Sequence, residues 1–207
     1  MAIQNNKEEV PFAHYAALFR ALSPEEAAAR CGVPFENGCF TLRLLGVDYR
    51  IAWPDYAITA SREDAFALTN LPCQTFLLRY LLEGREAALS LSYKTFREMP
   101  WGELYIAPYT GRCLTRAAFT FGTQVAAFAA ACERMGGEKL PHGDAGYQFT
   151  FLGGYRMQIM IYAGDEEFPP SSQILYSDNF ASAFSAEDRV VAGDILISAI
   201  RQEMKRN

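Results

Sequence analysis

The stretch YQFTFLGGYRMQIMIY, residues 147–162, carries the strongest β-strand signal in the chain. On either side of a glycine pair, every second residue is apolar: Tyr147, Phe149 and Phe151 before the pair, and Tyr155, Met157, Ile159 and Ile161 after it. A period of two places such side chains on one face of a strand. The stretch therefore predicts two antiparallel strands, each with one buried face, joined by a tight turn.

The register of this hairpin depends on the length of its turn. A two-residue loop, Gly153-Gly154, would set Phe149 opposite Gln158, an apolar side chain against a polar one. A three-residue loop, 152–154, pairs Phe149 with Met157 and matches apolar to apolar. We therefore predict the three-residue loop, with a glycine bulge.

Further helices and strands are predicted on both sides of the hairpin from periodicity and from helix-end signals. The expected helices are 11–21, 24–31, 71–83, 112–135 and a last one that begins at Ser185. The expected strands are a hairpin within 39–53 and single strands at 56–59, 88–95 and 172–177. Residues 97–109 are expected to form a structured loop.

Helix ends and one apolar stripe support these predictions. Ser23 with Glu26 predicts a capping box, and Ser185 is expected to cap the last helix with Asp188 in its first turn. Apolar residues three or four apart predict that the 112–135 helix is continuous; they are Leu114, Ala118, Phe121, Val125, Phe128, Cys132 and Met135.

These elements predict an α+β fold in a single domain, residues 1–207. N-terminal, central and C-terminal helices would surround a mostly antiparallel sheet. The connection from the 88–95 strand to the 147 strand passes through a long helix, so one parallel pair is left open.

Composition excludes several classes of protein. Half of the 207 residues are hydrophobic, which suits a packed core, and the net charge of −5 with scattered Lys and Arg argues against nucleic acid binding. No apolar run is long enough for a membrane helix, and the polar N-terminus is no signal peptide, so a cytoplasmic protein without membrane contact is expected. The odd count of five cysteines, without C-x-x-C, argues against disulfides and zinc.

The stretch GDEEFPPSSQILYSD, residues 164–178, gathers four acids: Asp165, Glu166, Glu167 and Asp178. They could ligate a hard cation, form an acid–base pair, or stay solvated on a turn. If 155–162 and 173–177 pair antiparallel, Asp178 lies ~16 Å from Asp165. The four acids are therefore not expected to form one site, and no metal site is assigned.

The second candidate is FREMPWG, residues 96–102, in which Arg97 and Glu98 precede a Pro-Trp-Gly turn. Arg97 could grip a carboxylate or phosphate, or pair with an acid of 165–167; the internal pair is favoured. Trp101, Tyr105 and Tyr109 could wall a pocket mouth. No catalytic serine or cysteine motif and no phosphate-binding glycine motif is present, so no catalytic residue is assigned.

Several blocks resemble an uncharacterised bacterial and archaeal family, the domain of unknown function numbered 3786. They are LPCQTFLLRYLLEG, SYKTFREMPWGELY, RMGGEKLPHGDAGYQF and GDEEFPPSSQILYSDNFASAFSAED. The chain departs from the family pattern in the Ser177 inserted before Asp178, and in Arg79, where members often show histidine. The resemblance implies anaerobic metabolism and, from relatives with iron–sulfur domains, a redox or corrinoid partner. This chain lacks such a cysteine-rich segment and cannot bind a cluster by that route.

Three functional hypotheses follow. The leading one is a non-catalytic accessory domain that binds a small molecule or a protein through the 97–109 and 164–170 segments. The alternatives are a metal-assisted enzyme that uses Asp165, Glu167 and Arg97, and a structural homodimer. The sequence assigns no cofactor and no oligomeric state.

Overall fold

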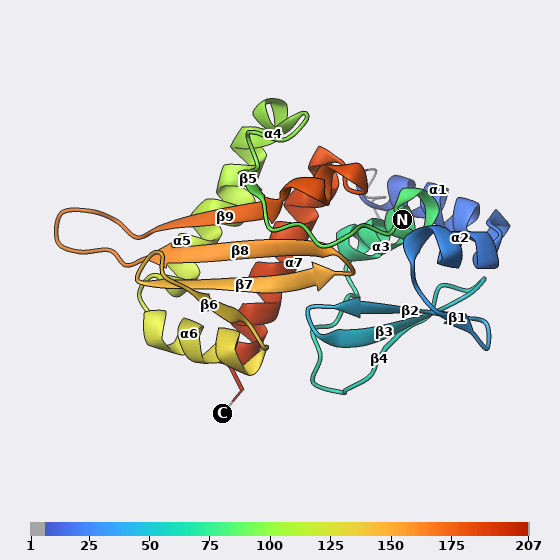
Figure 1. Ribbon diagram of the computed structural model, residues 1–207, viewed down its shortest axis with the longest axis horizontal. Helices are drawn as coiled ribbons and strands as arrows, with labels where there is room; N and C mark the ends of the chain where they lie inside the picture. Colours follow the sequence, from blue (N-terminus) through green and yellow to red (C-terminus); the bar gives the residue numbers. More distant parts are fainter. Residues whose placement is uncertain (1–6, 207) are drawn as a thin grey trace, which may run out of the picture. The chain divides into compact units, whose positions relative to one another are not determined.

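The computed structural model describes residues 7–206, and the chain divides into two compact units, the first ending at Glu86 and the second beginning at Ala87. Helices at the N-terminal, central and C-terminal parts of the chain accompany antiparallel strands (Figure 1). The predicted α+β class is confirmed. That the two units form one domain stays a prediction.

The first unit combines helices with a small antiparallel sheet. The helices are α1 (Glu9–Ala21), α2 (Pro24–Cys31) and α3 (Leu71–Glu83), and the strands are β1 (Phe35–Glu36), β2 (Cys39–Leu44), β3 (Val47–Ala52) and β4 (Ile58–Ala60). Strands pair in the order β1-β2-β3-β4. The predicted 39–53 hairpin is confirmed, and its turn places Leu45 and Gly46 at positive φ, as a tight two-residue hairpin turn requires.

The start of one helix in this unit differs from the prediction made from the sequence. Ser23 is the N-cap of α2, but its side chain makes no capping hydrogen bond, so the predicted Ser23–Glu26 capping box is wrong. Its backbone carbonyl accepts from Ala27 instead, and the helix start is fixed through the main chain. The Asn70 side chain caps α3 by accepting from the Cys73 amide at 2.8 Å.

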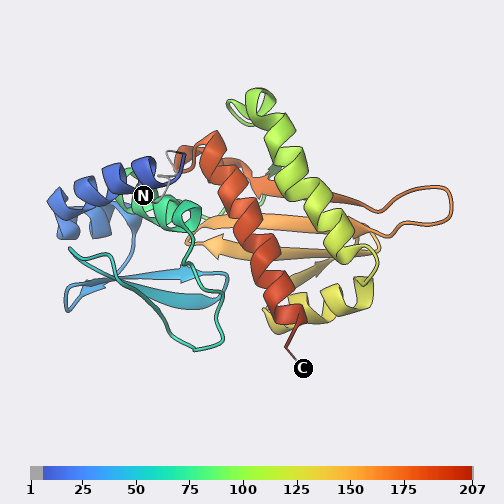
Figure 2. The same ribbon diagram turned by 180° about the vertical axis from the view of Figure 1, so that it is seen from behind.

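The second unit combines a five-stranded sheet with a layer of helices. Its strands are β5 (Tyr93–Thr95), β6 (Glu138–Leu140), β7 (Ala145–Leu152), β8 (Tyr155–Tyr162) and β9 (Ser171–Ser177), which pair in the order β6-β7-β8-β9-β5. Its helices are α4 (Gly102–Tyr109), the π-helix η1 (Thr110–Thr115), α5 (Arg116–Phe121), α6 (Val125–Arg134), the 3₁₀-helix η2 (Asp178–Ser182) and α7 (Ala186–Met204). Helices α5 and α7 lie behind the strands in Figure 1 and in front of them in Figure 2.

The β7–β8 hairpin combines a two-residue turn with the pairing of apolar residues that the sequence predicts. Leu152 pairs with Tyr155, so the turn holds only Gly153 and Gly154, and the predicted three-residue loop is wrong. A bulge between Thr150 and Leu152 then shifts the register by one residue. Phe149 therefore faces Met157, as predicted from apolar matching.

The stretch 88–109 differs from its prediction. The regular strand is only Tyr93–Thr95, because the main chain before it bonds to side chains, such as that of Asn179, which donates to the Ala88 carbonyl at 2.8 Å. Strand β5 pairs antiparallel with β9, and each pairing described within the two units is antiparallel, so the possible parallel pair is not found there. The expected loop 97–109 is helical from Gly102 on.

The predicted continuous helix at 112–135 is also wrong. Its first turns form the π-helix η1, and the helix stops after Phe121 and restarts at Val125. At the break, Gly122 lies so close to Pro170 that an added Cβ would touch the proline ring. The longest helix in the described chain is α7, with 19 residues. Its predicted cap is confirmed, since Ser185 and Asp188 form a reciprocal capping box.

Candidate functional site

The 96–102 segment is a tightly built loop. Glu98 shapes it from inside, because its Oε2 accepts from the Thr95 amide and the Thr95 hydroxyl, both at 2.7 Å. These bonds from Thr95 hold the pKa of the Glu98 carboxyl below its ordinary value. Phe96 and Met99 turn inward and are buried. Glu98 thus acts here as a structural residue of the loop.

A buried arginine anchors this loop to the start of α7. Arg189 is 1% exposed, donates through Nη1 to the Phe184 carbonyl at 2.9 Å and also donates to the Pro100 carbonyl. Its guanidinium lies 5.4 Å from the centre of the Phe96 ring. Sequence reasoning missed Arg189, since nothing in the helix pattern distinguishes a buried arginine from one on the solvent face.

Trp101 is the most exposed aromatic feature of the loop. Its side chain lies in solvent, with 73% exposure, although its backbone adopts the left-handed conformation at φ 62. Left-handed backbone is rare for a bulky residue and costs about 1–2 kcal/mol. The next residue, Gly102, is buried so closely under the Phe96 carbonyl that no side chain fits there. Leu104, one turn on, is 72% exposed, and we call Trp101 and Leu104 together the Trp101 surface.

The neighbours of the Trp101 surface differ from those predicted. Arg97 pairs with Glu103 at 2.9 Å, with both side chains largely exposed, so its predicted pairing with the acids of 165–167 is wrong. The reason is local: both partners lie on the same loop-and-helix segment. Tyr105 donates to Glu187 Oε1 at 3.1 Å. Tyr109 is buried and stacked on Phe96 at 4.0 Å, so it does not wall a pocket mouth.

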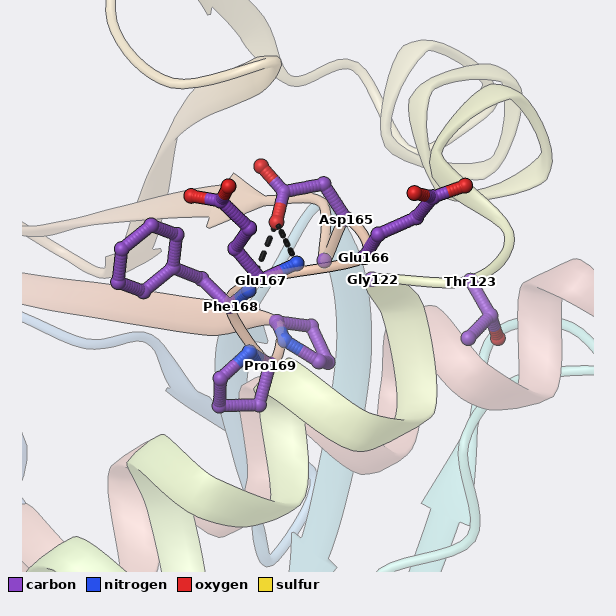
Figure 3. A pocket seen from close by; sticks show the side chains of 9 residues that line it. Gly122, Thr123, Asp165, Glu166, Glu167, Phe168 and Pro169 are labelled. Atoms are coloured by element: carbon purple, nitrogen blue, oxygen red, sulfur yellow. Dashed lines mark hydrogen bonds between the residues drawn. The ribbon is translucent and has the colours of Figure 1, made fainter.

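The acidic loop 164–170 holds its three acids apart. Asp165 folds the loop on itself, because its Oδ1 accepts from the Phe168 and Glu167 amides at 2.7 and 2.8 Å. Those two amides, Phe168 first, hold the pKa of Asp165 below its ordinary value. Figure 3 shows the Glu166 and Glu167 carboxylates pointing to opposite sides of the loop. The acids border a shallow hollow of about 370 Å³, beside Gly122 and Thr123, and remain solvated.

Asp178 lies apart from these acids. It begins η2 at the end of β9, while the 164–170 loop precedes the other end of that strand. Its carboxylate accepts from the Ser90 hydroxyl at 2.6 Å, and its amide donates to the Ser92 carbonyl at 2.9 Å. The prediction that four acids do not share one site agrees with the antiparallel β8–β9 pairing. Within residues 7–206, no three acidic, histidine or cysteine side chains converge in a way that could hold a metal ion.

Fold and site together define a class: an α+β protein with a tightly bonded loop that displays an exposed tryptophan. The family model of a domain of unknown function, DUF3786, matches residues 23–199, so the chain belongs to this family. Neither a curated protein nor a solved structure matches the chain. In the part of the chain that the structure describes, no helix has both the length and the apolar character needed to cross a bilayer.

Proposed function

We propose that this chain is a non-catalytic accessory protein that binds a protein partner through the Trp101 surface. The observation that carries the proposal is the 73% exposure of Trp101 on left-handed backbone. A large aromatic side chain kept in water at a conformational cost brings the folded chain no burial in return. A partner that covers the ring would supply that burial.

The construction of the loop favours binding of a protein. Arg189, Glu98 and Gly102 fix the backbone on both sides of Trp101, so little conformational entropy remains to be lost when a partner docks. Tryptophan is enriched among the few interface residues that dominate affinity, and Leu104 extends the apolar contact along α4. A preformed aromatic anchor is what a protein interface uses.

The composition of the surface indicates the chemistry of the partner. Arg97 and Glu103 neutralise each other on the exposed loop-and-helix segment that carries Trp101. The partner would therefore offer an apolar pocket that takes up the Trp101 ring and Leu104. The anaerobic setting, and a redox or corrinoid protein as that partner, rest on the family resemblance alone and serve here as candidates for testing.

The rival enzyme is less well supported by the geometry. Its three residues, Arg97, Asp165 and Glu167, are not brought together, since Arg97 pairs with Glu103 and Asp165 closes its own loop. The 164–170 loop remains a second contact region of the proposed binding module, through the exposed Phe168 beside the acids. No specific observation favours the homodimer over a different partner.

The test compares three forms of the chain as bait in lysate of its own source cells. They are the wild type, Trp101→Ala and the matched control Phe119→Ala, which removes an aromatic ring that is also exposed, on α5. We expect a protein retained by the wild type and by Phe119→Ala to be lost with Trp101→Ala. With that protein purified, the dissociation constant should rise at least about tenfold for Trp101→Ala, the size of a hot-spot residue.

Two outcomes would contradict the proposal. If all three baits retain the same proteins equally, the Trp101 surface is not the docking site. If sedimentation shows a wild-type dimer that Trp101→Ala turns into a monomer, the occupant is a second copy of the chain rather than a different protein.

A further inference from the structure

The sheet of the second unit has one face covered by helices and an opposite face that carries polar side chains. Tyr147 and Phe151 point to the helix layer, where they contact the rings of Phe128 and Phe180. Because side chains alternate along a strand, Gln148 on β7 points to the other face. Its cross-strand partner Gln158 lies on that same face.

Five polar side chains from four strands form a connected cluster on this opposite face, where Gln148 and Arg156 are buried. We call it the Arg156 cluster, and its members are Tyr93, Glu138, Gln148, Arg156 and Gln158.

The bonds of the Arg156 cluster converge on Gln148. Its Oε1 accepts from the Tyr93 hydroxyl and from Gln158 Nε2, the latter at 3.0 Å, and its Nε2 donates to Glu138 Oε2 at 2.7 Å. The other oxygen of Glu138 accepts from Arg156 Nη2 at 2.6 Å. Burial raises the pKa of Tyr93 above its ordinary value, so its hydroxyl stays a donor at neutral pH.

Arg156 is left incompletely bonded in this cluster. Arg156 is only 6% exposed, and its buried Nε has no hydrogen-bond partner among the described residues. A buried guanidinium N–H without an acceptor costs free energy that a bound acceptor would recover. Its one carboxylate partner, Glu138, has 64% side-chain exposure. An exposed carboxylate at the rim of a short strand is readily displaced.

We propose that Arg156 and its cluster bind a small ligand through a carboxylate group on the face of the β5–β9 sheet opposite the helix layer. The ligand carboxylate would accept from Arg156 Nε and, beside it, from the second amide proton of Gln158. The site uses none of the residues of the Trp101 surface, so it goes beyond the proposed docking function.

Charge and shape favour a carboxylate over a phosphate. Arg156 and Glu138 together carry no net charge, so a phosphate dianion would meet the repulsion of Glu138 without an excess of positive charge. A planar monoanion matches the planar guanidinium edge and needs only two donors. In this proposal Glu138 is the partner of Arg156 in the absence of ligand, and the ligand carboxylate displaces it.

The test follows the Nε–Hε resonances of the arginines by NMR in the full-length protein while sodium acetate is added at constant ionic strength. We expect the Arg156 resonance to shift along a saturating curve. Arg43 is the internal control, because it too pairs with one carboxylate, Asp48, at 3.0 Å, but on an exposed hairpin. Its resonance should show no saturation.

Two variants sharpen the result. Glu138→Gln removes the competing carboxylate and should tighten acetate binding by about fivefold, the factor expected for the loss of one partly exposed ion pair. Arg156→Lys, checked for fold by its amide spectrum, keeps the charge but removes Nε and should abolish saturable amide shifts around Gln158.

The proposal is overturned if acetate moves Arg156 no differently from Arg43 in both the wild type and Glu138→Gln. It is also overturned if inorganic phosphate saturates the Arg156 shift while acetate does not. Either result leaves the proposed function of the Trp101 surface standing, since the partner capture with Trp101→Ala does not depend on Arg156.

Discussion

At the scale of the residue, Glu203 illustrates how one buried carboxylate ties stability to pH. It lies in the last turn of α7, 7% exposed, and accepts from Arg134 Nε at 2.9 Å and Arg206 Nη1 at 2.7 Å. Burial alone would raise its pKa, but these hydrogen bonds outweigh burial and hold the pKa below the ordinary value of 4.5. The folded state therefore gains stability from ionised Glu203 above that pH and loses it as the pH falls through the lowered pKa.

Glu203→Gln should lower the free energy of unfolding at neutral pH by about 1.5–3 kcal/mol, the range for hydrogen bonds to a charged group. The difference from the wild type should shrink below the ordinary pKa of 4.5, where the unfolded state takes up the proton first. Urea unfolding at several pH values measures both. Asp48→Asn breaks an exposed ion pair and should change stability by under about 1 kcal/mol. A Glu203→Gln deficit that stays constant as the pH falls would contradict the assignment.

At the scale of the element, the break between α5 and α6 depends on a close approach. An added Cβ on Gly122 would press on the Pro170 ring and lie 2.6 Å from the Ala118 carbonyl oxygen. Gly122→Ala should therefore lower the free energy of unfolding by about 1–3 kcal/mol, the usual cost of overpacking. Gly111→Ala in η1 is the matched control, because nothing lies within 4 Å of its added Cβ. Alanine there should raise stability by about 0.5–1 kcal/mol. Equal midpoints in urea for the two variants would refute the packing account.

The same break shows where sequence reasoning succeeds and where it ends. Strands β7 and β8 were predictable, because alternation and the glycine pair lie within the hairpin itself. The 112–135 stripe predicted one helix because periodicity reports only which face is apolar, whereas the break is held by Pro170, a residue of a distant loop. Likewise, opposite charge predicted that Arg97 pairs with the acids of 165–167. Arg97 pairs instead with Glu103, which is nearer along the chain. A contact with a distant segment decides the first case, and a partner nearby in the chain decides the second.

The candidate site was likewise predictable from the sequence only in part. The sequence indicated Trp101 as a feature of a rigid turn, since Pro and Gly flank it. Its left-handed backbone and exposure depend on Arg189, which reaches the loop from α7. The Arg156 cluster escaped notice because Gln148, Arg156 and Gln158 fit the polar face of ordinary alternating strands. Only the register that places them beside Glu138 shows that they are bonded to one another.

At the scale of the whole molecule, the chain is hydrogen-bonded within each unit right up to the boundary between them. The Glu86 amide donates to the Arg30 carbonyl at 2.7 Å in the first unit, and Asn179 donates to the Ala88 carbonyl at 2.8 Å in the second. Only Ala87 lies between these two anchors. The family match, 23–199, also runs across the boundary, so both units recur as one sequence block. The single domain predicted from the sequence stays a prediction, which the unfolding of the two units would test.

A single domain predicts one cooperative unfolding transition. Amide NMR signals of Ile51 on β3 and Ile159 on β8, both fully buried, report separately on the two units as urea is added. We expect their midpoints to coincide, and to stay together in Gly122→Ala, which alters only the second unit. If that variant lowers the midpoint of Ile159 and leaves Ile51 unchanged, the units unfold independently and the chain holds two domains. The variant makes the comparison informative even when the wild-type midpoints agree by chance.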